Sequence, residues 1–151
     1  MGRIFYDVIA YEAALDAAVD SAMQGYVCDK TKEIIQEAIE DHVYSAHESG
    51  WTGPPPARRK KDGGIQDEAN LFADYSNLTL TIREVAHWQN KFGKKVNSFG
   101  YSLPPTSDLG DVIENSGIFS APPRPFMRDA EVMAKDKLEK VLQAAMLFEG
   151  F

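Results

Sequence analysis

The chain has 151 residues, a formal net charge of −7 at pH 7 and a single cysteine, Cys28. This length suits one domain with a real hydrophobic core, and the negative charge argues against general nucleic-acid binding, because affinity for phosphates depends on many Lys and Arg side chains. One cysteine excludes an intrachain disulfide and a cysteine-based zinc cluster, and since no stretch approaches the roughly 20 apolar residues that cross a bilayer, no membrane partner is expected.

The N-terminal third of the chain carries two amphipathic patterns. Over residues 8–26, apolar side chains recur every three or four positions, which predicts a helix. A second helix is predicted over residues 29–49, with Gly50 as a left-handed cap. No strong helix breaker separates the two patterns, so one bent helix is an open alternative.

Residues 50–66 are predicted to form an extended loop, because glycines and three prolines stand beside four consecutive cations, and such a stretch does not form a packed element. The cations are Arg58, Arg59, Lys60 and Lys61. One interpretation is a solvated loop that keeps the protein soluble. Another is an arm that meets an acidic surface on a neighbouring subunit. Contact with nucleic acid is a weaker third, since four cations give only a modest, salt-sensitive attraction.

A β-hairpin is predicted after this loop. Residues 69–74 and 78–85 read as strands, joined by a turn over residues 75–77, and the second strand alternates apolar and polar side chains as a half-buried strand does. Residues 86–105 follow no single period and receive no assignment. A short helix, capped at Thr106 or Ser107, is predicted to run through Ile113.

A stiff, proline-rich lead-in at residues 122–125 precedes the best amphipathic pattern of the chain, over residues 126–148. Prolines fix φ, and a residue before proline avoids the helical region, so the chain is expected to arrive extended and to become helical at about Pro125. The apolar stripe continues through Phe148. One long C-terminal helix is therefore predicted.

Four aromatic or cationic residues in this part of the chain are candidate contacts. Phe126 is most simply a core residue of the last helix, and an interface peg is the alternative. Arg124 and Arg128 flank it, and their forked guanidinium groups suit carboxylate partners. An exposed Phe151 would be unfavourable, so its ring is expected to dock, and contact with a partner is one use of it.

Together these elements predict an α+β fold: N-terminal helices, a small antiparallel β-sheet with a long basic loop, a short helix and a long C-terminal helix. We expect them to form a single domain over residues 1–151.

Motifs for catalysis are missing from the sequence. His42 and His47 lie five apart, so they do not share a helix face as a pair of zinc ligands would, and His87 stands apart from both. No serine elbow, phosphate loop or cysteine signature is present. We therefore predict that the protein is not an enzyme and carries no cofactor and no metal. A hydrolase that uses two of the many carboxylates stays as an alternative.

Three segments, in order, carry a resemblance to a known family. The first is a helix that runs into Val43-Tyr44 and a basic, proline-containing loop. The second is Gly63-Gly64-Ile65-Gln66-Asp67, leading into a hairpin. The third is Asp111-Val112-Ile113-Glu114-Asn115-Ser116-Gly117, followed by Arg124-Pro125-Phe126 and the last helix. This pattern, over about residues 28–151, resembles the small tail-completion, or head-tail joining, proteins of long-tailed bacteriophages. Residues 1–27 form an additional N-terminal helix that departs from the pattern.

The resemblance implies a structural virion protein of the phage neck or tail that is made in the bacterial host cytoplasm. Such a protein acts by assembly, as a ring-like homo-oligomer together with neighbouring neck and tail-tube proteins. Tail-terminator and head-closure roles are alternatives, and so is a regulatory or nucleic-acid-binding module that uses the basic loop. The candidate assembly contacts are Arg58, Arg59, Lys60, Lys61, Arg124, Phe126, Arg128 and Phe151.

Overall fold

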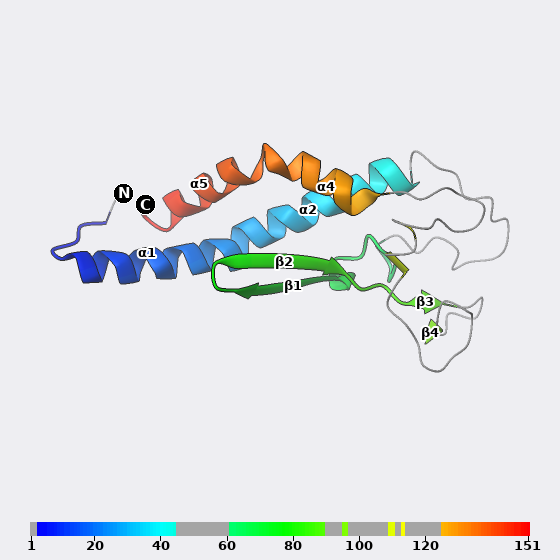
Figure 1. Cartoon of the computed structure of the whole chain (residues 1–151), viewed down its shortest axis with the longest axis horizontal. Helices are drawn as coiled ribbons and strands as arrows, with labels where there is room; N and C mark the ends of the chain where they lie inside the picture. The colour runs from blue at the N-terminus through cyan, green and yellow to red at the C-terminus, as the bar shows by residue number, and fades with distance from the viewer. Residues whose placement is uncertain (1–2, 45–60, 90–94, 97–108, 111–112, 114–124) are drawn as a thin grey trace.

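A computed structural model describes residues 3–44, 61–89, 95–96, 109–110, 113 and 125–151 (Figure 1). The elements are α1 (Val8–Ala22), the π-helical turn η1 (Met23–Val27), α2 (Cys28–Ile39), the π-helical turn η2 (Glu40–Tyr44), the short 3-10 helix η3 (Glu68–Asn70), β1 (Leu71–Ser76), β2 (Thr79–Glu84), β3 (Trp88–Gln89), β4 (Lys95–Val96), α4 (Phe126–Lys135) and α5 (Leu138–Phe148). Helices combined with a small antiparallel sheet make the fold α+β, as predicted.

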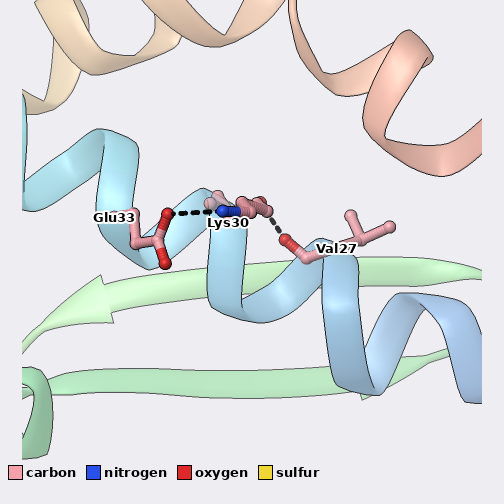
Figure 2. Close-up of polar contacts among 4 residues, drawn as sticks. Val27, Lys30 and Glu33 are labelled. Carbon is pink, nitrogen blue, oxygen red and sulfur yellow. Dashed lines mark hydrogen bonds and ion pairs between the residues drawn. The ribbon is translucent and has the colours of Figure 1, made fainter. Parts of the chain in front are cut away.

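The first four elements form one continuous helix, which settles the open alternative in favour of a single helix. Asp7 begins it: its backbone is extended, and its side chain accepts a hydrogen bond of 2.7 Å from the backbone N–H of Ala10. Where η1 passes into α2, the hydroxyl of Thr31 donates to the carbonyl oxygen of Val27 at 2.7 Å. Such side-chain donors satisfy carbonyls where the regular helical ladder is disturbed. Figure 2 labels Val27, and it also labels the ion pair one turn further on, in which Nζ of Lys30 lies 3.0 Å from the Glu33 carboxylate.

Strands β1 and β2 form an antiparallel hairpin whose register runs from Leu71 opposite Glu84 to Ser76 opposite Thr79. The predicted turn over residues 75–77 is wrong, because Tyr75 and Ser76 belong to β1. The two turn residues are Asn77 and Leu78, with φ of 50° and 61°. Two positive φ angles define the tight turn whose twist matches that of the strands, and this match outweighs the reluctance of leucine to adopt a left-handed backbone.

The single C-terminal helix predicted over residues 126–148 is also wrong, because the helix breaks between α4 and α5. Asp136 has φ −90° and ψ −13°, and the N–H of Lys137 donates to the carbonyl of Ala134 at 3.0 Å, which closes a tight turn. Helix α4 packs against α2, whereas α5 packs against η1 and α1. The break lets the two halves follow different stretches of the long N-terminal helix.

Two hydrophobic clusters lie along the contact between the long N-terminal helix and the helices α4 and α5. The larger cluster consists of Ile34, Ile35, Ala38, Ile39, Val43, Ile65, Leu71, Ala86, Ile113, Phe126, Ala130 and Ala134. The smaller one consists of Ala22, Val27 and Ala145, with Met23, Leu80, Val141, Leu142 and Met146 packed against it. Leu80 and Ile82 of β2 touch one cluster each, so the hairpin spans both.

Two regions between the hairpin and α4 are partly described. Trp88–Gln89 pairs with Lys95–Val96 as a short antiparallel ladder, in the region that received no assignment. Leu109, Gly110 and Ile113 have helical backbone, and Ile113 is buried in the larger cluster. The rest of the short helix predicted there, like the proline-rich lead-in before Pro125, lies outside the described residues. Within the described part of the chain, no helix combines the length and apolar character needed to cross a membrane.

Candidate assembly surface

The structure separates the candidate contact residues. Phe126 is fully buried in the larger cluster, at 0% exposure, so the core interpretation is confirmed and its ring does not project as a peg. Lys61 and Arg128 are exposed. Arg58, Arg59, Lys60 and Arg124 lie outside the described residues.

Phe151 docks on the N-terminal segment of its own chain, because the two ends of the chain lie side by side (Figure 1). Its ring stacks on Phe5, with centroids 5.8 Å apart, and meets Tyr11 edge-on at 5.9 Å. Phe5 and Tyr11 are themselves in edge-to-face contact at 5.2 Å. The guanidinium of Arg3 lies 5.5 Å from the centroid of the Phe151 ring. These are favourable aromatic and cation–π geometries.

A Schellman motif fixes the end of α5 in this position. The N–H of Phe151 donates to the carbonyl of Met146 at 2.9 Å, and the N–H of Gly150 donates to that of Leu147 at 3.1 Å. Gly150 has φ +91°, which glycine adopts without strain, and a Cβ at this position would lie only 3.1 Å from Cγ of Arg3. The chain end is therefore held by backbone geometry as well as by ring stacking.

Two further bonds tie the same region to the rest of the molecule. The hydroxyl of Ser21 in α1 donates to the Glu149 carboxylate at 2.8 Å. The N–H of Arg3 donates to the carbonyl of Gly150 at 3.3 Å. The N-terminal segment, α1 and the end of α5 thus form one connected structure.

Around this structure lie large apolar side chains that are mostly exposed, each at least 69%. We call them the apolar tip: Ile4, Tyr6, Val8, Ile9, Leu147 and Phe148. Scattered apolar residues are normal on a surface, but several at one end of a molecule are typical of an interaction site. The sequence pattern includes Val8 and Phe148 in the apolar stripes of two predicted helices, yet both side chains are exposed. Helical periodicity identifies a face without showing how far along the helix a neighbour covers it.

The first part of the long helix, which begins at the apolar tip, is acidic. Between Ile4 and Asp29 the chain has no Lys or Arg. The exposed carboxylates in this stretch of the described chain are those of Asp7, Glu12, Asp16, Asp20 and Asp29. Asp20 accepts a hydrogen bond of 2.7 Å from the hydroxyl of Tyr75 in β1, which raises the pKa of Tyr75 to about 12. The surface combines exposed apolar side chains with negative charge.

The segment Gly63–Asn70, which precedes β1, is joined to the long helix by hydrogen bonds of a buried side chain. Gln66 is buried at 4% exposure, its side-chain amide donates to the Gln36 carbonyl at 3.0 Å, and Gln36 returns a bond of 3.0 Å to the carbonyl of Gln66. Gln66 also donates to the Glu40 carboxylate at 3.2 Å. Buried polar groups that satisfy one another in this way stabilise a unique packing.

Asp67 and Asn70 complete this segment. The Asp67 carboxylate accepts from the N–H of Gly63 at 2.7 Å and from that of Ala69 at 2.9 Å. The side-chain amide of Asn70 donates to the carbonyls of Gly63 and Gly64 at 3.1 and 2.9 Å. These bonds lie within the segment itself. The segment therefore anchors one end of the basic loop to α2 and η2, and sequence reasoning missed this anchoring role.

The described residues do not form a metal site. In residues 3–44, 61–89 and the other described parts, no three His, Cys, Asp or Glu side chains are grouped so that they could hold a metal ion. Cys28 is buried, and burial raises the pKa of its thiol.

No protein-family model, curated protein or solved structure matches the chain.

Proposed function

We propose that the protein is a structural virion component of the neck or tail of a long-tailed bacteriophage, and that it acts in tail completion or head-tail joining by oligomeric assembly. The observation that carries the proposal is the apolar tip. Large apolar side chains exposed to water are unfavourable in an isolated molecule, and binding to another subunit removes them from water.

The rigidity of the tip supports an assembly role. The Schellman motif at Gly150 and the rings of Phe5, Tyr11 and Phe151 fix its two segments relative to each other. A surface that is ordered before binding loses less conformational entropy when a partner docks. A fixed apolar surface thus favours tight and specific contact between subunits.

The resemblance adds a second, weaker line of support. Within Gly63-Gly64-Ile65-Gln66-Asp67, Ile65 belongs to the larger cluster and Gln66 is bonded to α2. Because Ile65 and Gln66 are buried, this part of the pattern supports a fold in common with the phage family more strongly than a binding partner in common with it. Tail-terminator and head-closure roles belong to the same class and would use the same surface.

Removal of the gene from the phage that encodes this chain tests the proposal. We expect cells to accumulate heads and tails without infective particles, and the wild-type chain supplied in trans should restore infectivity. A chain with Tyr6→Ser and Phe148→Ser should fold normally and fail to restore it, because these rings are 95% and 89% exposed and so contribute to binding rather than to the core. Normal titres of infective particles without the gene would refute the proposal.

A further inference from the structure

We infer that the apolar tip of one copy binds the proline-rich, basic segment at residues 54–61 of a second copy, in a head-to-tail arrangement. This inference rests on the proposed function, because it names the partner of the surface on which that function depends.

The chemistry of the tip specifies what it binds. Tyr6 and Phe148 present exposed aromatic rings, next to exposed aliphatic side chains such as that of Ile9. The adjoining face of α1 carries the exposed carboxylates of Glu12 and Asp16. A matching ligand must bring apolar groups that pack on aromatic rings, together with positive charge.

The chain itself contains such a ligand at residues 54–61, Pro-Pro-Pro-Ala-Arg-Arg-Lys-Lys. Proline-rich segments are recognised by surfaces lined with aromatic side chains. Arg58, Arg59, Lys60 and Lys61 are the longest run of consecutive cations in the sequence. Guanidinium groups pair well with carboxylates, and opposite charge speeds and orients the encounter. The segment thus matches the tip in both apolar character and charge.

Chain length places the partner on another molecule. Helix α1 through η2 is continuous from Val8 to Tyr44, which at about 1.5 Å per residue separates these residues by about 54 Å. Pro54 follows Tyr44 by ten residues, so even a fully extended chain carries it only about 35 Å from Tyr44. The prolines therefore cannot reach the N-terminal part of the tip, which contains Tyr6, Val8 and Ile9, on their own molecule.

The other end of the segment is held in the same region. Lys61 precedes Gly63 by two residues, and the Gly63–Asn70 segment is bonded to α2 and η2 through Gln66. Arg58 stands three residues before Lys61, within about 10 Å of it when extended. The anchor at Gly63–Asn70 thus lies beside α2 and η2, far along the long helix from the start of α1 (Figure 1). A contact between unlike ends propagates from copy to copy and closes into a ring when its rotation permits.

Charge reversal on each side of the contact tests the inference with the full chain. The first variant, Glu12→Lys with Asp16→Lys, reverses the charge beside the tip. The second replaces all four cations from Arg58 to Lys61 with Glu. By sedimentation equilibrium at low salt, each variant alone should associate at least tenfold more weakly than the wild type. An equimolar mixture of the two should recover most of the association, because every tip then finds a loop of opposite charge.

A matched control separates this contact from a general effect of net charge. Glu37→Lys with Asp41→Lys makes the same charge change at the same spacing, on exposed positions near the other end of the same helix. This variant should retain the wild-type association. The inference is overturned if the control weakens association as much as the first variant does, if the mixture does not recover it, or if the wild type does not self-associate.

The same variants distinguish failure of this inference from failure of the proposed function. A loop-reversed chain that still associates and still restores infectivity would eliminate the loop as the partner while leaving the virion role intact. Infective particles formed without any copy of the chain would instead refute the virion role.

Discussion

Replacement of Phe126 by alanine is the sharpest test of how the C-terminal part of the molecule is built. The ring is completely buried, at 0% exposure, among Ile35, Ile39, Leu71 and the other side chains of the larger cluster. Truncation of a buried phenylalanine costs about 3–5 kcal/mol, from lost burial and from the cavity that remains. That is a large part of the roughly 5–15 kcal/mol by which a domain is stable.

Thermal and urea unfolding, followed by circular dichroism, measure this loss. For a chain of this size, each kcal/mol lowers Tm by about 2–4 °C, so Phe126→Ala should lower it by about 6–20 °C. Phe148→Ala is the matched control: the same truncation on a ring that is 89% exposed should change stability by less than about 0.5 kcal/mol. Equal effects of the two substitutions, or a loss below about 1 kcal/mol for Phe126→Ala, would refute the reasoning that separates core from surface rings.

Further substitutions test individual features of the backbone and one titrating group. Leu78→Gly should stabilise the protein by about 0.5–1 kcal/mol in urea unfolding, because Leu78 has φ +61° and a left-handed backbone costs a leucine about 1–2 kcal/mol. The side chain is 61% exposed, so its removal loses little buried surface. Destabilisation would contradict the turn geometry. Gly25→Ala should raise Tm by about 2–4 °C, since a Cβ at this position of η1 meets nothing within 4 Å and alanine favours a helix by about 1 kcal/mol. A lower Tm would show that the π-helical turn requires glycine. Gly150→Ala should destabilise by at least about 1 kcal/mol, because φ is +91° and Arg3 is close; unchanged unfolding would mean that the Schellman motif does not form in solution. The pKa of Tyr75 is raised to about 12 by its bond to Asp20, so the stability from this bond should be complete below pH 10 and lost as the pH rises from 10 to 12. Tyr75→Phe should remove that part of the alkaline loss of stability. Identical alkaline unfolding of the wild type and this variant would argue against the bond.

The sequence predicted the elements whose signals are local. The helical period over residues 8–26 and 29–49 identified the N-terminal helix, which the structure describes from Val8 to Tyr44, and the alternation in β2 identified the hairpin. Element ends were less predictable. The turn lies at Asn77–Leu78 because the strand register requires it, and leucine is not a residue that indicates a left-handed turn.

The break between α4 and α5 could not be predicted from residues 135–138, which contain neither glycine nor proline. It follows from the packing of α4 on α2 and of α5 on η1, and such contacts join residues far apart in the chain. The same limit applies to the apolar tip. Ile4, Ile9 and Leu147 read from the sequence as ordinary apolar residues, and only the arrangement of three segments shows that their side chains remain exposed.

The most direct measurement of the central claim is a cryo-electron microscopy map of the intact phage particle at side-chain resolution. Our account predicts several copies of the chain around the axis of the neck or tail, with the rings of Tyr6 and Phe148 buried against a neighbouring subunit. A particle that contains no copy of the chain, or one in which both rings remain in solvent, would contradict it.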